Sequence, residues 1–137
     1  PVYYECEKKG RDRADKDDYK VKLSVAFCFS NQNELLEYFH NSSFLEHGGS
    51  PDKAVTNAFV YAIDIYLKQT NKYAKNEAKI TFGDVKDCLI LVSNSFSTFT
   101  SYENQTKKAI NNPFIAEAMT EFLRSELEFY FIENKCW

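Results

Sequence analysis

The sequence predicts an α+β fold in which helices pack on one face of a mixed or antiparallel sheet. Residues 19–29 alternate between apolar and polar side chains, residues 88–94 begin with a continuous apolar run, and two amphipathic stretches each begin at a proline. The chain has 137 residues, 44% of them hydrophobic. It is therefore expected to form one domain that buries a substantial core.

The first half of the chain predicts three strands. Residues 1–7 are expected to form a short strand, and residues 8–18, KKGRDRADKDD, carry charges of alternating sign that predict a solvated hairpin tip and not a binding patch. Residues 19–29, YKVKLSVAFCF, show the period-two alternation of a strand with one face on a core. After a turn at 30–33, ELLEYFH at 34–40 fits a partner strand. An antiparallel meander is the expected arrangement.

The segment HGGSPD predicts the start of a helix. Gly48 and Gly49 end the preceding strand, Ser50 is expected to cap the helix, and Pro51 suits the first helical position, where no amide donor is needed. Apolar side chains then recur every three or four residues to about Gln69. We interpret this stripe as a face of the core and not as a cofactor site.

The second half of the chain predicts a turn, a strand and a helix. Residues 70–79 form a polar connection, and ITFGDVKD at 80–87 is expected to hold a single helical turn. The apolar run CLILVSN at 88–94 predicts a buried central strand. Asn112 and Pro113 repeat the cap-plus-proline signal and open a second long amphipathic helix.

Composition excludes several classes of function. A net charge of −3 and a pI near 5.4 make the chain a poor polyanion binder on its own. The four cysteines, which are Cys6, Cys28, Cys88 and Cys136, are scattered without a CxxC pair, and the chain has only two histidines. No metal site is therefore expected. The thiols are expected to be free, which indicates a reducing cytoplasm. No apolar stretch approaches the roughly 18 residues of a membrane span.

Three segments resemble one known family, and one of them is YKVKLSVAFCF at 19–29, which is similar to a strand of that family. FGDVKDCLILVSNSFSTFTSYENQTK at 82–107 is similar to a family pattern that runs acidic, Asp, Val, Arg or Lys, acidic, Gly, Leu, then a strand, then a loop ending Phe-Glu-Gly-Gln-Thr-Lys. EHGGSPDKAVTNAF at 46–59 resembles the family's Glu-Gly-Gly-Thr-His segment and the helix after it. The family is the transducer domain of the ATPase subunit of bacterial type IIA DNA topoisomerases, which comprises gyrase B and its topoisomerase IV counterpart.

The resemblance implies a fold and a set of roles. The fold would be ribosomal-protein-S5-domain-2-like with a left-handed crossover, and residues 1–137 would form a single transducer domain that couples ATP binding and hydrolysis to DNA strand passage. Lys107 would contact the terminal phosphate of ATP and act in catalysis, and Gln105 would bind the same nucleotide. ATP and Mg²⁺ would be held mainly by a preceding nucleotide-binding domain. The other implied partners are an A-type subunit, DNA and a second copy of the subunit, all in the cytoplasm and without a membrane.

The sequence departs from the family pattern at several positions. Family residues are replaced by Ser50-Pro51, Cys88, Thr98-Phe99-Thr100 and Asn104. We find no counterpart of the nucleotide-binding domain, so an excised domain or a reduced relative that cannot bind ATP alone is expected. A stand-alone interaction module with the same fold is the alternative. The mismatch-repair MutL proteins and the heat-shock chaperone ATPases share this kind of second domain, but their lysine loops lack the Glu-x-Gln-Thr-Lys context.

Overall fold

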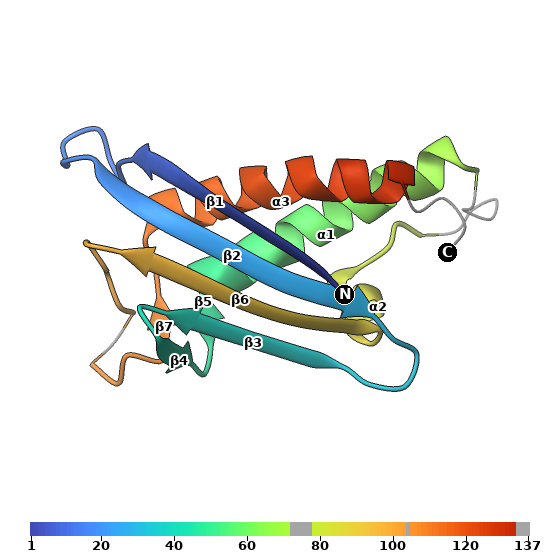
Figure 1. Cartoon of the computed structure of the whole chain (residues 1–137), viewed down its shortest axis with the longest axis horizontal. Coiled ribbons are helices and arrows are strands. Elements are labelled where there is room, and N and C mark those ends of the chain that lie inside the picture. The colour runs from blue at the N-terminus through green and yellow to red at the C-terminus, as the bar shows by residue number, and fades with distance from the viewer. Residues whose placement is uncertain (72–77, 104, 134–137) are drawn as a thin grey trace.

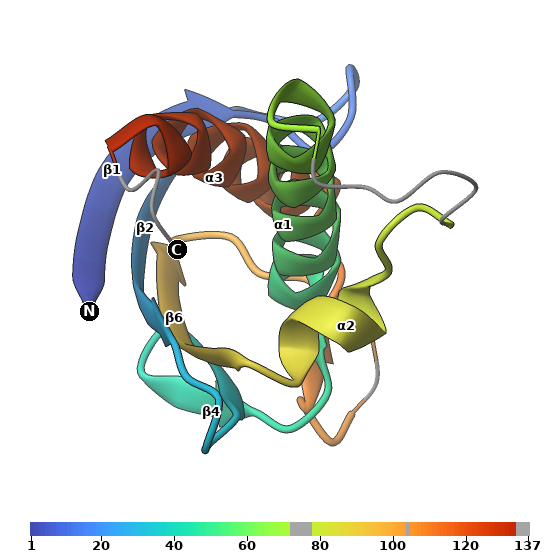
Figure 2. The same cartoon turned by 90° about the vertical axis from the view of Figure 1, so that its right-hand side faces the viewer.

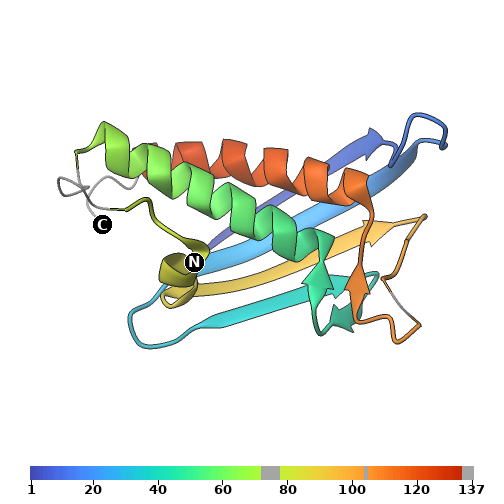
Figure 3. The same ribbon diagram turned by 180° about the vertical axis from the view of Figure 1, so that it is seen from behind.

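The computed structural model describes residues 1–71, 78–103 and 105–133, and within them two helices cover one face of a five-stranded sheet (Figures 1 and 3). The sheet order is β1-β2-β6-β3-β4. The strands of this sheet are β1 (Val2–Gly10), β2 (Tyr19–Phe29), β3 (Leu35–His40), β4 (Ser43–Leu45) and β6 (Leu89–Ser97). A second, two-stranded sheet pairs β5 (Gly48–Gly49) with β7 (Ala109–Ile110). The helices are α1 (Ser50–Gln69), α2 (Phe82–Lys86) and α3 (Pro113–Glu133).

The predicted α+β class is confirmed, but the predicted antiparallel meander is wrong at β3. β1 pairs with β2 and β2 with β6, both antiparallel, whereas β3 runs parallel to β6 and does not pair with β2. β6 takes the central place because both of its faces are apolar: Leu89 and Leu91 are fully buried toward the helices, and Ile90 and Val92 are partly buried on the other face. The sheet is therefore mixed.

The connection from β3 to β6 has the handedness that the resemblance implies. In Figure 1 both strands point to the left, and the chain passes from β3 to α1 behind the sheet before it returns along β6, which lies above β3. This path makes a left-handed crossover, whereas parallel crossovers are right-handed in nearly all other folds. Figure 2, seen nearly along the strands, shows α2 close to the start of β6.

The core lies between the sheet and the two long helices. Every second side chain of β2 points into it, and these side chains are at most 2% exposed: Val21, Leu23, Val25 and Phe27. The Phe27 ring meets those of Phe59 on α1 and Tyr130 on α3, each at a centroid distance of 5.3 Å. The period-two pattern of β2 and the helical stripes thus meet in one apolar layer, as predicted. Among the described helices, none is long and apolar enough to cross a membrane.

The start of α1 differs from the prediction in its cap. Gly49 occupies the capping position, and Ser50 is already helical. The Ser50 hydroxyl does not bond to its own helix but donates to the main-chain carbonyl oxygens of Asn112, at 2.9 Å, and Ile110, at 3.4 Å. The predicted single turn at 80–87 is confirmed as α2, where the Asp84 carboxylate accepts from the Thr81 amide at 3.0 Å.

The β1–β2 hairpin is more ordered than its charge pattern predicts. β1 extends to Gly10, so the expected strand end at residue 7 is too early. Asp12 is only partly exposed, and its carboxylate accepts from the Tyr19 hydroxyl at 2.6 Å and from the Phe114 amide in the first turn of α3 at 3.0 Å. Burial, together with the bond to Asp12, raises the pKa of Tyr19, which stays protonated as the donor. Asp12 thus caps α3 in place of the predicted Asn112.

His40, at the end of β3, makes the stability of the fold depend on pH. It is fully buried, and its ring nitrogens lie 2.7 Å from the Ser95 hydroxyl oxygen and 2.8 Å from that of Thr100. Burial lowers the pKa of His40 to about 4. Because the unfolded histidine binds a proton near pH 6.5, stability is complete above that pH and falls as the pH drops toward 4, by up to about 1.4 kcal/mol per pH unit.

Denaturant unfolding between pH 4 and pH 7 tests this expectation. His40→Gln keeps a polar group beside the two hydroxyls but cannot titrate, so its free energy of unfolding should depend less steeply on pH in this window. His47→Gln is the control because His47 is exposed, and it should keep the native slope. An unchanged slope in His40→Gln would contradict the assignment.

Candidate functional site

Lys107 lies at the tip of a loop, on the side of the fold where β6 ends. The turn at Gln105–Thr106 precedes it, and Gln105, Thr106 and Lys107 are exposed. Lys107 has a φ of 57°, a left-handed conformation that holds the loop in a sharp reversal. Its ammonium nitrogen lies 5.7 Å from the centre of the Tyr102 ring, within the range of a cation–π contact. The two residues singled out from the resemblance, Gln105 and Lys107, therefore share one exposed tip.

We call residues 101–111 the lysine loop; within it, Asn104 lies outside the described residues. Backbone hydrogen bonds close the base of this loop. Tyr102 and Ile110 form an antiparallel bridge. The Glu103 amide donates to the Ala109 carbonyl at 2.9 Å, and the Asn111 amide donates to the Ser101 carbonyl at 2.8 Å. Because both arms are tied, a displacement of the tip acts on the chain just before α3.

β7 also ties the lysine loop to the start of α1. Gly48 pairs with Ala109 and Gly49 with Ile110 in parallel register, and the His47 amide donates to the Lys108 carbonyl at 2.9 Å. Gly49 has a φ of 82°, and a Cβ atom added there would lie 2.0 Å from the Ile110 carbonyl oxygen. The two-glycine segment is thus needed for a close backbone approach as well as for ending a strand.

Lys108 differs from its neighbour. Its ammonium nitrogen lies 3.1 Å from a carboxylate oxygen of Glu46, and both side chains are about half exposed at 44% and 54%. This contact is a surface ion pair, which contributes up to about 1 kcal/mol. Of the two adjacent lysines, Lys107 is the one whose ammonium has no carboxylate within ion-pair distance among the described residues.

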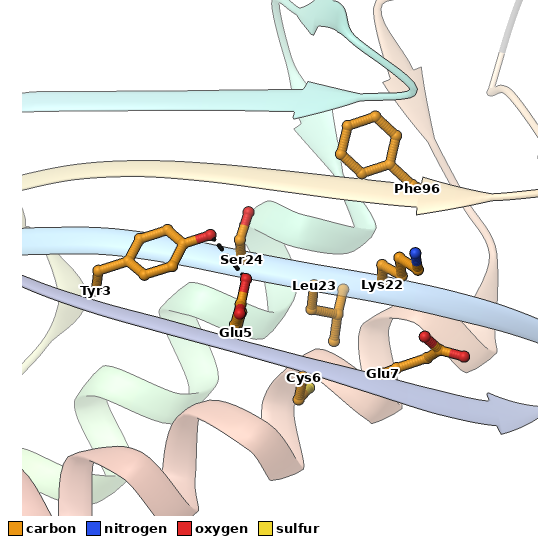
Figure 4. Close-up of a pocket in the computed structure, with 8 residues that line it drawn as sticks. All are labelled: Tyr3, Glu5, Cys6, Glu7, Lys22, Leu23, Ser24 and Phe96. Carbon is orange, nitrogen blue, oxygen red and sulfur yellow. Dashed lines mark hydrogen bonds between the residues drawn. The ribbon is translucent and has the colours of Figure 1, made fainter.

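A separate depression lies on the sheet face that α1 and α3 leave uncovered (Figure 4). Its volume is about 460 Å³, and it is lined by Tyr3, Glu5, Cys6, Glu7, Lys22, Leu23, Ser24 and Phe96. The Tyr3 hydroxyl donates to Glu5 on the same strand at 3.1 Å. The Cys6 side chain packs against the core, and this burial raises the pKa of its thiol, which makes it a poor nucleophile near neutral pH. This depression lacks the lysine loop and offers no catalytic pair.

The arrangement can supply one cation to a ligand and little else. Within the described ranges, no three His, Cys, Asp or Glu side chains are grouped so that they could hold a metal ion. The Lys107 ammonium suits a phosphate oxygen, and the exposed Gln105 amide can donate beside it. A bound triphosphate needs several more ligands than these two, so the exposed tip fits a role as one corner of a larger phosphate site.

The chain matches a family model described as DNA gyrase B over residues 1–136. It is 24% identical over 133 residues to the DNA gyrase B protein of Metamycoplasma hominis, which covers 97% of this chain and 20% of that protein. It is 28% identical over 121 residues to the DNA gyrase B protein of Spiroplasma citri, covering 87% and 19%. The chain therefore spans about a fifth of the length of these relatives.

Two solved structures resemble the fold. The topoisomerase IV ATP binding domain of Francisella tularensis superposes with a TM-score of 0.74 at 20% identity, covering 93% of this chain and 34% of that one. The 43K ATPase domain of Thermus thermophilus gyrase B gives a TM-score of 0.71 at 17% identity, covering 96% and 34%. Both confirm the α+β fold with helices on a mixed sheet.

Proposed function

Because this chain belongs to the DNA gyrase B family, we propose that it is the transducer domain of the ATPase component of a type II topoisomerase. In this role residues 1–137 form one domain that couples ATP binding and hydrolysis to DNA strand passage. The observation that carries the proposal is the lysine loop: an exposed Lys107 stands on a base that is bonded to the starts of both long helices.

Lys107 would contact the terminal phosphate of ATP. A lysine ammonium is a compact point charge on a flexible stem, suited to stabilise the charge that develops on a departing phosphoryl group. Gln105, on the same exposed turn, would donate an amide hydrogen to that phosphate. ATP and its Mg²⁺ would be held mainly by a preceding nucleotide-binding domain, and the described residues of this chain contain no group of three or more His, Cys, Asp or Glu side chains that could hold the metal ion.

Phosphate binding would be transmitted through β7. Ala109 and Ile110 follow the lysine within three residues and pair with the two glycines that directly precede α1, while α3 begins three residues after β7. A tip fixed by a phosphate would therefore shift the starts of two packed helices together. The partners implied for the complete enzyme are an A-type subunit, DNA and a second copy of the ATPase subunit, in the cytoplasm.

Lysine acetylation tests the proposed contact. In the complete ATPase subunit, a non-hydrolysable ATP analogue should slow the acetylation of Lys107, because its ammonium becomes bonded to phosphate. Lys108 is the internal control, since its ammonium pairs with Glu46 and its labelling should not respond to the analogue. Equal labelling of Lys107 with and without the analogue would contradict the proposed contact with the terminal phosphate.

The isolated chain is expected to show no measurable ATP hydrolysis. Its exposed tip offers one lysine and one glutamine, whereas phosphoryl transfer requires the triphosphate and its metal ion to be held in line with a nucleophile. Phosphate release by the purified chain should match that of its Lys107→Ala variant. Turnover above that variant would show that a complete site exists within this chain.

A further inference from the structure

Asn112 is a completely buried polar residue at the point where the lysine loop meets α3. Its side-chain oxygen accepts from the Ser101 amide at 2.7 Å, and its side-chain nitrogen lies 3.0 Å from the Asp12 carboxylate and 3.1 Å from the Tyr19 hydroxyl. These partners fix the orientation of the amide, since a flipped group would place its oxygen against a carboxylate. Ser101 belongs to the base of the lysine loop, and Asp12 and Tyr19 belong to the β1–β2 hairpin.

The main chain of Asn112 extends the same junction to both helices. Its carbonyl oxygen accepts from the Ser50 hydroxyl at 2.9 Å, at the start of α1, and from the Ala116 amide at 3.3 Å, in the first turn of α3. Asp12 reaches α3 independently through the Phe114 amide at 3.0 Å. One buried residue therefore joins the lysine loop and α3, which flank it in sequence, to the β1–β2 hairpin and the start of α1, which do not.

Asn112 makes more contacts than a helix cap requires. A cap needs one side-chain acceptor for an amide of the first turn, and Asp12 already supplies it. The Asn112 side chain is used instead between the hairpin and the lysine loop, where it satisfies one group on each side. An amide buried with complementary partners at both ends transmits a displacement, because separating either contact leaves a buried polar group unsatisfied.

We propose that Asn112 is a positioning residue that makes the placement of the lysine loop depend on the β1–β2 hairpin. This inference rests on the proposed function and extends it: a loop drawn toward a phosphate displaces Ser101, Asn112 follows, and the hairpin at residues 10–19 moves with it. The hairpin is then a second output of the transducer, in addition to α1 and α3. Asn112 acts through Lys107 and does not itself touch the nucleotide.

An exchange of the two side chains tests the link in the complete ATPase subunit. Asn112→Asp places two carboxylates about 3 Å apart, as the Asn112–Asp12 distance indicates, and Asp12→Asn sets two amide nitrogens against each other. Each single variant should lower kcat for ATP by roughly 2- to 30-fold with little change in nucleotide affinity. The double variant Asp12→Asn/Asn112→Asp restores one amide facing one carboxylate and should recover most of the lost kcat.

Asp18→Asn is the matched control, because Asp18 lies on the same hairpin but bonds to Arg11, with both side chains partly exposed. It should keep the native kcat. Tyr19→Phe is the milder variant if a single exchange prevents folding, since it removes one hydroxyl and retains the ring; it should lower kcat to a smaller extent. Native kcat in both single variants and in Tyr19→Phe, or a double variant no better than the singles, would overturn the inference.

Amide hydrogen exchange in the 137-residue chain separates this inference from the proposed function. Asp12→Asn should speed exchange at the Ser101 amide more than at the core amides of β2, and the double variant should reverse the effect. If Lys107→Ala does not lower turnover, the proposed function fails, while faster Ser101 exchange still supports the link between hairpin and loop. If Lys107→Ala lowers turnover but exchange at Ser101 is unaffected by Asp12→Asn, only the link fails.

Discussion

Gly49→Ala is expected to destabilise the chain by roughly 3 kcal/mol or more. Gly49 has a φ of 82° and a ψ of −119°, a region that residues with a side chain rarely adopt. The added Cβ would also lie 2.0 Å from the Ile110 carbonyl oxygen, which is backbone and cannot rotate away. β5 and β7 must separate to admit it.

Gly83→Ala provides the matched control. Gly83 lies within α2, where an added Cβ has the Thr81 hydroxyl oxygen as its nearest neighbour at 3.6 Å, an ordinary contact. This replacement should leave stability unchanged or raise it by roughly 0.4 to 1 kcal/mol, because alanine restricts the unfolded chain. Urea unfolding of both variants distinguishes strain at Gly49 from a general effect of replacing glycine. Equal midpoints would show that the β5–β7 approach tolerates a side chain.

The elements that the sequence predicts well are those with a strong local pattern. β2 has the predicted bounds, 19–29, because strict alternation marks each residue as facing the core or the opposite face. The run at 88–94 forms the centre of the sheet because both of its faces are apolar. Both long helices have a proline at or next to their first residue, as predicted: Pro51 in α1 and Pro113 in α3.

The errors concern partners that are distant in sequence. Nothing in ELLEYFH shows that β3 pairs with a strand in the second half of the chain and not with β2, because pairing depends on which strands the helices bring together. Likewise, Asp12 resembles the other carboxylates of its charged hairpin, and only the fold places it 3.0 Å from the Asn112 amide. An asparagine before a proline predicts a cap, but here the buried amide bonds to the hairpin and the loop.

The candidate site is only partly accessible from sequence. Gln105 and Lys107 are singled out by resemblance, since a three-residue motif in a polar loop carries no pattern of its own. β7 has no sequence signal, because two residues are too few to show alternation, and yet it connects the lysine loop to α1. The ion pair of Lys108 with Glu46 joins residues that are distant in sequence, so it escapes prediction for the same reason as the Asp12 contact. This pair gives the two adjacent lysines different surroundings.

Lys107→Ala in the complete ATPase subunit is expected to lower ATP turnover by roughly 100- to 1,000-fold. The ammonium stands on a loop whose base is fixed by backbone bonds, so it is positioned before the reaction begins. Such a charge interacts more strongly with the transition state, where negative charge develops on the departing phosphoryl group, than with bound ATP. Nucleotide affinity should therefore change much less than turnover, because in the proposed function a preceding domain would hold the base and the inner phosphates.

Lys108→Ala is the control for this prediction, and it removes the same charge one residue away. Its loss breaks a half-exposed ion pair with Glu46, which costs up to about 1 kcal/mol of stability and should leave turnover nearly unchanged. Steady-state hydrolysis and equilibrium binding of a non-hydrolysable analogue, measured on both variants, separate the effect on catalysis from the effect on affinity. If the two variants hydrolyse ATP at the same rate, Lys107 does not reach the terminal phosphate and the loop is only a surface connection between β6 and α3.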